Sequence, residues 1–483
     1  MTTPARHRRL AFAAGLTLFA VTGVGEARAQ GPGAPGGPCS LEFENTPNSR
    51  LSISRLPSGK SNTFLGGGVV AHCANQPITL KSDSAEYYGD RDVLYLVGSV
   101  HYQEPRATVD SRRMTYFHAE ERLLAEGDVV AVLPSGTSMR GPEATYFRPT
   151  AGRPQARLIA TGRPRMSLVQ RDSAGRAQEP VGLVADRVFM DGDSLVYAGG
   201  TVEITRSDLD ARGDSAFLDS GREFARLMKT PSIVGKGQRV FRLSGSRIDL
   251  FSHQRQLQRV LSVQNAKATS EDMTLTSDTL DLRVVANKLD RAVAWGPGRA
   301  HVVSTANDIV ADSLDVFMPG QQIREVHALR NAFAQSVPDT AKIRTTERDW
   351  LRGDTIIARF DSVPSADTTK RPRVREVVAT GAARSFYHLA SRSGDRNRPA
   401  INYVRGREIT VAFRDQAVNT VTVYDKAAGL YLEPSDSTAA RATPGVAADS
   451  ARAGNRPAGA RPATTSPARR GVRRPTRIPP TSP

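Results

Sequence analysis

A short phrase of residues recurs ten times along this chain. Each copy begins with a small or charged residue and continues with two apolar residues spaced two apart, as in residues 82–87 and 277–282. The copies start at residues 82, 111, 140, 185, 211, 244, 277, 311, 352 and 405, and most successive starts lie about 26 to 34 residues apart. A unit this small cannot bury its own apolar face, so it has to stack on its neighbours. The repeat therefore predicts one long stacked structure rather than several unrelated domains.

Within each unit, apolar residues alternate with polar ones. Ala85 and Tyr87 share one face of a first run, and Leu94 and Leu96 share one face of the next. This alternation is typical of half-buried β strands. The residue pairs at 89–90, 192–193 and 286–287 suit short turns, which favours antiparallel neighbours over the rival parallel β-helix. The sequence thus predicts an all-β fold, a continuous antiparallel sheet folded on itself.

The N-terminal 29 residues have the pattern of a secretory signal peptide. Arg6, Arg8 and Arg9 precede an apolar run over residues 10–24, and Ala27-Arg28-Ala29 fits the small-x-small cleavage pattern. We expect an exported protein that begins near Gln30. An uncleaved membrane anchor is the alternative, although the run is short for a span of about 20 residues.

Three further regions follow the signal. Residues 30–75 form a Gly/Pro-rich leader with N-terminal strands, and residues 76–432 carry the repeats. Residues 433–483 are rich in Pro, Ala, Thr, Ser and Arg and too poor in large apolar residues to fold, so we expect a disordered basic tail. Both cysteines of the chain, Cys39 and Cys73, lie within residues 30–75. In an oxidising compartment these two cysteines are candidates for a disulfide, worth about 3–4 kcal/mol in the chain-entropy model; two unpaired thiols are the alternative.

Charge and motifs argue against several classes of function. The formal net charge is +17. An exported chain without a recognisable nucleic-acid-binding motif is nevertheless a poor candidate for binding nucleic acid. The eight histidines are scattered, so we expect no metal site, and no catalytic or cofactor motif is recognisable. The aspartates that recur at equivalent repeat positions predict turn or strand-entry chemistry rather than an acid–base pair: Asp83, Asp186, Asp278 and Asp312. We expect a protein that is not an enzyme.

The opening repeat resembles a known family. Residues 76–83, followed by Leu94-Tyr95-Leu96-Val97-Gly98-Ser99-Val100, are similar to the start of the organic-solvent-tolerance protein A family, the LptA-like periplasmic lipopolysaccharide-transport bridge proteins. The phrase returns at residues 123–129 and, more weakly, at residues 198–202. The resemblance is clear over about residues 76–166. It implies an open, twisted β-jellyroll, a taco-like trough whose apolar groove holds acyl chains and whose edge strands can join end to end. This chain has about twice the repeats of the small bridge proteins.

Two functions follow as hypotheses. The first is a periplasmic bridge that carries lipopolysaccharide or a related acylated lipid toward the outer membrane, working with the export machinery of the inner and outer membranes and associated with either. The second is a structural or adhesive β-solenoid with a closed core that binds cell-wall or protein partners. Residues alone do not separate an open groove from a packed core; with the family resemblance added, we expect the open groove in the earlier repeats. Arg112, Arg140 and Arg187 are candidates for a rim near lipid phosphates. The candidate lipid-binding wall is Ala85, Tyr87, Leu94, Leu96, Met114, Tyr116, Ala144, Tyr146, Val188, Met190, Ala216, Leu218, Ile248, Leu250, Leu280, Leu282, Leu314, Val316, Ile409 and Val411.

Overall fold

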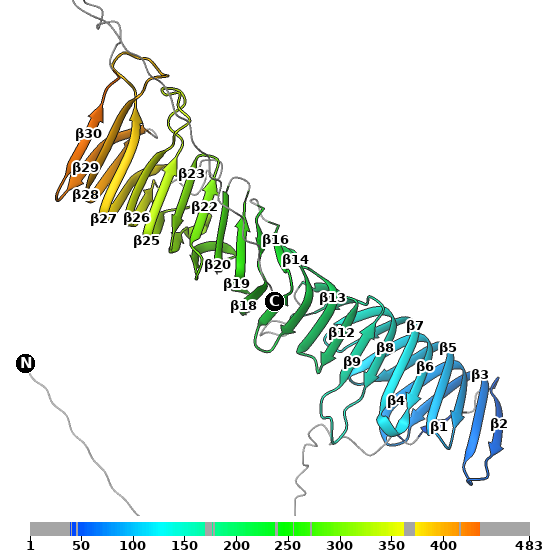
Figure 1. The fold of residues 1–483 in the computed structure, drawn as a ribbon. Helices are drawn as coiled ribbons and strands as arrows, with labels where there is room; N and C mark the ends of the chain where they lie inside the picture. The colour runs from blue at the N-terminus through cyan, green and yellow to red at the C-terminus, as the bar shows by residue number, and fades with distance from the viewer. Residues whose placement is uncertain are drawn as a thin grey trace, which may run out of the picture. The chain divides into compact units, whose positions relative to one another are not determined.

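The described part of the chain is a single antiparallel β-sheet. The computed structural model describes residues 39, 41–44, 47–169, 176, 179–236, 240–254, 256–270, 273–361, 372–414 and 417–434, so the expected signal peptide and tail lie outside the described residues. Thirty strands form one sheet and follow one another along it (Figure 1). No helix within these ranges has the length and hydropathy needed to cross a bilayer. The predicted all-β antiparallel fold is confirmed.

Within the described ranges, the strands are interrupted by two short 3-10 helices, η1 (His118–Glu120) and η2 (Pro319–Gln321). The first half comprises β1 (Leu41–Phe43), β2 (Arg50–Arg55), β3 (Ser61–Cys73), β4 (Gln76–Tyr88), β5 (Val93–Glu104), β6 (Ala107–Phe117), β7 (Arg122–Val132), β8 (Ser138–Phe147), β9 (Arg157–Thr161), β10 (Arg165–Leu168), β11 (Val181–Val184), β12 (Arg187–Asp191), β13 (Leu195–Thr205), β14 (Leu209–Asp219) and β15 (Phe224–Met228). The second half comprises β16 (Ser232–Gly235), β17 (Arg242–Ser244), β18 (Arg247–His253), β19 (Gln256–Thr269), β20 (Met273–Val285), β21 (Lys288–Trp295), β22 (Ala300–Ser304), β23 (Asn307–Ala311), β24 (Ser313–Phe317), β25 (Glu325–Ser336), β26 (Asp349–Phe360), β27 (Val374–Leu389), β28 (Ala400–Arg414), β29 (Ala417–Tyr424) and β30 (Ala428–Leu432).

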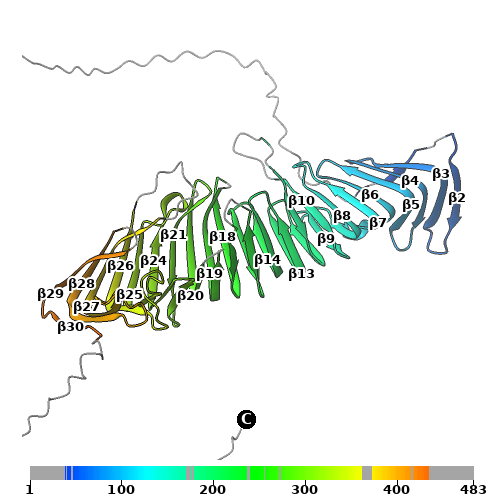
Figure 2. The ribbon, with the colours of Figure 1, turned by 90° about the horizontal axis from the view of Figure 1, so that it is seen from above.

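Each long strand bends near its middle, and the bends divide the sheet into two walls. In β20, for example, the first half pairs with β22 and the second half with β21. Wall A consists of β1, β10, β11, β16, β17, β22, β23 and β30, together with those halves of the long strands that are hydrogen-bonded in the same row. Wall B consists of β2, β9, β12, β15, β18, β21, β24 and β29 with the other halves. Figure 2 shows the strands of the sheet from a second side, from β2 to β30. The inner faces of both walls share one apolar core. We call the loops at the free edge of each wall its rim, and the opening between the two rims the mouth.

The repeated phrase of the sequence forms the bend. Ser82, Ser111 and Ser277, which begin three of the copies, are buried, and each hydroxyl donates a hydrogen bond to the backbone carbonyl two residues ahead. The neighbouring strand carries a β-bulge with left-handed backbone, as at Gly98 (φ 77°) and Ser99 (φ 43°) of β5. A small inner residue and a bulge together let the strand turn from one wall into the other.

The recurring aspartates flank this bend. Asp186 and Asp312 immediately precede β12 and β24, as a strand-entry role predicts. The prediction is wrong for Asp83 and Asp278, which lie inside β4 and β20 because the strand continues through the bend instead of ending there. The expected short turns at residues 89–90, 192–193 and 286–287 do connect consecutive strands.

A glycine substitution tests the tightness of the bend. A Cβ added at Gly98 would collide with the Asp83 carboxylate, whereas Gly59, with a similar φ of 82°, has no atom near that position. We expect Gly59→Ala to lower the free energy of unfolding by about 1 kcal/mol through its backbone alone, and Gly98→Ala by about 2–3 kcal/mol. Chemical denaturation measures both. Adding Asp83→Ala to Gly98→Ala should recover part of the additional loss at Gly98, because it removes the carboxylate but leaves the Asp83 Cβ at 2.9 Å from the added Cβ. Equal losses for the two glycines would argue against a crowded bend.

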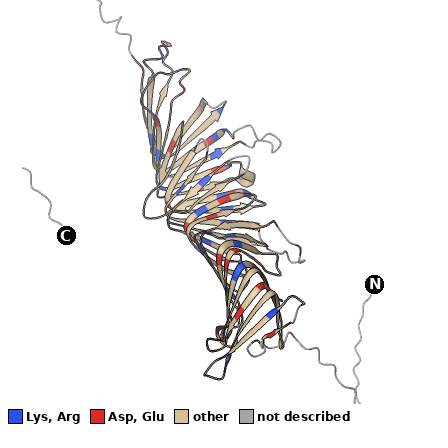
Figure 3. Ribbon diagram, turned by 90° about the vertical axis from the view of Figure 1, so that its right-hand side faces the viewer, with Lys and Arg blue, Asp and Glu red and all other residues tan. Residues whose placement is uncertain are grey.

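Arginine and aspartate side chains pair across strands on the outer face of wall B. The Nε–Oδ1 distances are 2.7 Å for Arg226–Asp249 and 2.8 Å for Arg259–Asp281. Basic and acidic residues are interspersed along the sheet (Figure 3). Asp249 and Asp281 are nearly covered by their arginines although they point away from the core. Much of the arginine excess of this region is therefore neutralised by cross-strand pairs.

Candidate functional site

Every residue of the predicted lipid-binding wall lies in wall B and faces the other wall. All of them are buried except Tyr87 and Leu218, which are partly exposed. Their inward direction follows from the period of two within each half strand. That they contact lipid stays a prediction.

The sequence interpretation missed the inner face of wall A. A matching row of buried apolar side chains lines it, including Leu80, Tyr102, Val109, Met139, Leu183, Ile204, Ile233, Leu243 and Leu275. In β4 the inward residues are Leu80 and Ser82 before the bend but Ala85 and Tyr87 after it, so the alternation changes phase there. The same phase change occurs in β20 between Ser277 and Leu280. A sequence interpretation that assumes one continuous alternation along the strand misses this change and therefore misses wall A.

Exposure of the inner face differs along the sheet. Between β5 and β8 most inner residues are sealed, with Leu133 partly buried: Leu94, Tyr102, Tyr116, Leu123 and Met139 are each about 1% exposed or less. From β14 onward many inner apolar residues that pack on the core are only partly buried: Leu218, Ala225, Leu257, Ala268, Leu289, Val302, Ile309, Val326, Ala334, Val377, Val404, Val421 and Val423. The sealed stretch from β5 to β8 does not fit the open groove expected in the earlier repeats. The later repeats hold more of the partly exposed inner residues, although Leu280, Leu314 and Ile409 there are fully buried.

The arginines proposed for the rim lie elsewhere. Arg112 is at the bend of β6, where its exposed side chain pairs with Asp128 of β7. Arg140 and Arg187 lie next to the bend in β8 and β12. Because the bend is the edge opposite the mouth, these residues do not form a headgroup site at the rim.

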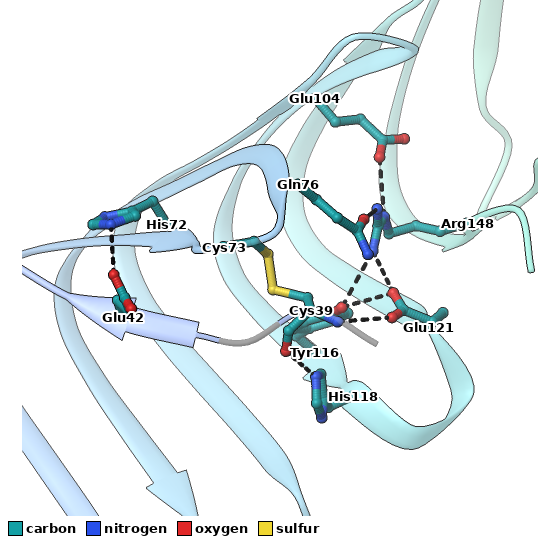
Figure 4. Close-up of a disulfide and its surroundings, with 10 residues drawn as sticks. All are labelled: Cys39, Glu42, His72, Cys73, Gln76, Glu104, Tyr116, His118, Glu121 and Arg148. Carbon is teal, nitrogen blue, oxygen red and sulfur yellow. Dashed lines mark hydrogen bonds and ion pairs between the residues drawn. A yellow bond between two sulfur atoms is a disulfide. The ribbon is translucent and has the colours of Figure 1, made fainter. Parts of the chain in front are cut away.

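A disulfide-anchored segment closes the mouth at the N-terminal end. Cys39 and Cys73 form a disulfide with a Cα–Cα distance of 5.3 Å, and β1 pairs with the end of β3 in wall A. The backbone of Cys39 reaches wall B on its other side: its N–H donates to Glu121 Oε1 at 3.3 Å, and its carbonyl contacts the His118 ring (Figure 4). We call Cys39 together with β1 the strap. It is fixed covalently to wall A and by hydrogen bonds to the rim of wall B.

Arg148 joins the two rims beside the strap. It follows β8 in wall B, and its Nε lies 3.0 Å from Oε2 of Glu104, which ends β5 in wall A. Its other guanidinium nitrogens contact Glu121 and Gln76. The three ionised side chains are at most 10% exposed. Charge-assisted hydrogen bonds of this kind, buried and fully paired, hold two surfaces in one register.

Inner tyrosines complete this cluster. The Tyr116 hydroxyl donates to Glu121 Oε2 at 2.7 Å, and the Tyr146 hydroxyl donates to Glu104. We call Arg148, Glu104, Glu121, Tyr116, Tyr146 and Gln76 the clasp. Two tyrosines predicted to line a lipid groove therefore serve, in this structure, to close the mouth. The sequence carried no signal for this role, because the members come from three successive repeats and from Gln76, which precedes the first copy.

A second polar chain lies next to the strap. The Tyr87 hydroxyl donates to Asp92 Oδ1 at 2.9 Å, and His118 Nδ1 lies 2.8 Å from Asp92 Oδ2. Burial acts to raise the pKa of Asp92, but the hydrogen bonds from His118 and Tyr87 outweigh it and lower the pKa. An ionised Asp92 thus orients His118 toward the Cys39 carbonyl. No group of three or more metal-ligating side chains among the described residues is arranged to hold a metal ion.

Alkaline pH should loosen this closure. Burial, followed by the hydrogen bond to Asp92, raises the pKa of Tyr87 to about 12, and burial also raises the pKa of Tyr116 and Tyr146. The unfolded chain ionises its tyrosines near pH 10, so stability is complete below that pH and falls as pH rises from about 10 to 12. Phenolate absorbance together with stability between pH 8 and 12 measures the effect. Tyr87→Phe should shrink the loss in that window; an unchanged pH profile would contradict this assignment.

Comparison with known proteins adds a structural likeness. No family model and no curated protein sequence matches the chain. Among solved structures, the chain is similar to LptH of Pseudomonas aeruginosa, described as the LptA homologous periplasmic component of the conserved lipopolysaccharide transport device. The match has 19% sequence identity and a TM-score of 0.23, and it covers 26% of this chain and 94% of LptH. A TM-score of this size carries no argument about function.

Proposed function

We propose that this chain is a periplasmic lipid-carrying bridge whose inner faces hold the acyl chains of lipopolysaccharide or a related lipid on the way to the outer membrane. The observation that carries the proposal is the two-walled apolar interior, which continues through every repeat and is partly accessible from β14 onward. The resemblance of residues 76–166 to the LptA-like bridge family and the expected signal peptide support the lipid class and the compartment.

The interior suits acyl chains for a simple physical reason. Burying one methylene group contributes about 0.8 kcal/mol, so a partly buried chain of a dozen carbons gains several kcal/mol without any hydrogen bond. Successive repeats offer similar side chains, such as Leu280 and Leu282 in one and Leu314 and Val316 in the next. A ligand bound at neighbouring repeats therefore has similar free energy, which favours stepwise movement along the trough.

The ends of the sheet support partnership with other export components. β2 is exposed throughout and carries Leu51 and Ile53 on its surface, and β30 exposes Leu430, Tyr431 and Leu432. Each of these strands is paired on one side, with β3 and β28 respectively. Exposed apolar edge strands favour β-strand addition by another chain. We include end-to-end association with a second copy, or with inner- and outer-membrane machinery, in the proposal.

The second candidate is a structural solenoid with a permanently closed core. The sealed inner face between β5 and β8 favours it. Lipid binding by the purified chain separates the two, using mass spectrometry of co-purifying lipid and binding of radiolabelled lipopolysaccharide. We expect bound lipid, a loss of at least tenfold in binding for the inward Val326→Glu, and no change for Val285→Glu on an exposed position. Absence of lipid from the unaltered chain would favour the solenoid.

A further inference from the structure

We propose that the strap and the clasp keep the interior beneath β3 to β8 closed to lipid, so that acyl chains occupy the interior from about β14 onward. This inference rests on the lipid-carrying function proposed above and assigns its site within the chain. It makes the N-terminal repeats a closed end of the trough rather than its entrance.

The first support is that the closure joins the two walls. Cys39 is bound to wall A by the disulfide to Cys73 and to the rim of wall B by Glu121 and His118. Arg148 of wall B pairs with Glu104 of wall A. The rims of this part can separate only when these contacts break, since both walls are tied to the same buried groups (Figure 4).

The second support is that the disulfide favours rapid reclosing after the two rims have separated. When the rims part, the disulfide keeps Cys39 at the rim of wall A, so the strap remains in position to meet Glu121 and His118 again when the rims approach. A tethered group rebinds at a high effective concentration, because little translational freedom is lost on closing. The open state of this part is therefore short-lived while the disulfide is intact.

The third support comes from the later repeats. Their inner residues at the mouth, such as Leu289, Val302 and Val326, retain partial exposure. The ion pairs that the described rim residues form there join groups of one wall: Arg359 pairs with Glu325 and Glu376 in wall B, and His388 pairs with Asp349 in wall A. An acyl chain can reach this interior without breaking a bond between the walls.

Photo-crosslinking in living cells tests the assignment in the full-length chain. A benzophenone amino acid is placed at Leu94 or Leu123, which face the closed interior, and at Val302, which faces the accessible one. Tyr95, the outward neighbour of Leu94, gives the background. In the unaltered chain we expect lipid adducts at Val302 and only background at Leu94 and Leu123. In the chain with Cys39→Ser and Arg148→Met, we expect adducts at Leu94 and Leu123 to rise to the level of Val302.

The possible outcomes distinguish a failure of this inference from a failure of the proposed lipid-carrying function. Adducts at Leu94 in the unaltered chain as strong as at Val302, or no rise on releasing the clasp, overturn the closed end. No adduct at any position, Val302 included, overturns the lipid-carrying function itself. Should the released variant be degraded in cells, amide hydrogen exchange of the purified chain under reducing conditions takes its place. Faster exchange in β4 to β8, with β19 to β25 unchanged, is then expected, and uniform exchange contradicts the closure.

Discussion

Replacing Arg148 by methionine should lower the free energy of unfolding of the N-terminal repeats by about 3–5 kcal/mol, because Glu104 and Glu121 are then left buried without their counter-charge. Both carboxylates are nearly inaccessible to water, and the guanidinium also contacts Gln76. Burial alone would lower the pKa of Arg148, but the surrounding Tyr102, Glu104 and Glu121 raise it, so the arginine stays charged. The loss falls on the segment from β4 to β8.

The measurement has to report on that segment. Both tryptophans, Trp295 and Trp350, lie in β21 and β26, so their fluorescence follows the other end of the sheet. Amide hydrogen exchange resolved by peptide gives the local free energy of opening. Arg112→Met is the matched control: its ion pair with Asp128 is exposed, and we expect a change of about 1 kcal/mol or less. Similar effects of the two substitutions would show that the clasp does not stabilise the closure.

Removal of the disulfide should have an effect of similar size. Cys39 and Cys73 are 34 residues apart, and closing such a loop stabilises a fold by about 4 kcal/mol in the chain-entropy model. In Cys39→Ser the strap also loses its anchor on wall A, so its hydrogen bonds to Glu121 and His118 no longer hold a fixed segment. We expect faster amide exchange in β1, β3 and β4 and earlier unfolding in denaturant.

Reduction of the unaltered chain serves as the control that avoids a new side chain. Glu121 contacts both the strap and Arg148. The losses of unfolding free energy caused by Cys39→Ser and by Arg148→Met should therefore not be additive in the double variant. A double-mutant cycle measures this coupling, which we expect to exceed about 0.5 kcal/mol. Additive losses in the cycle would mean that the strap and the clasp act independently. Unchanged amide exchange in the reduced protein would mean that the strap does not stabilise the closure.

The fold was largely predictable from the sequence because its two determinants are local. The alternation of Ala85 and Tyr87, or of Leu280 and Leu282, gives the inward direction of each half strand, and the recurring phrase marks each unit. The bend was not predictable by the same means, because it consists of a small inner residue opposite a bulge on another strand. Wall A was missed for this reason, as the phase of the alternation changes there.

The closure of the mouth was beyond a sequence interpretation for a different reason. Arg148 meets Glu104 and Glu121 across separations of 44 and 27 residues, and each of them, taken alone, is an ordinary charged strand or loop residue. The sequence proposed the pair Cys39 and Cys73 but not that the Cys39 backbone reaches the rim of wall B. Only the folded sheet brings these groups together. The predicted signal peptide and basic tail lie outside the described residues and stay predictions.

The most direct test of the lipid-carrying interior compares two adjacent valines of β22. Val302 faces the core and Val303 faces outward, yet both side chains are at least partly accessible, so position and chemistry are matched except for direction. A photo-crosslinking amino acid at each position in living cells should give lipid adducts at Val302 and none at Val303. Equal adducts at both positions, or adducts at neither, would contradict an interior that carries lipid.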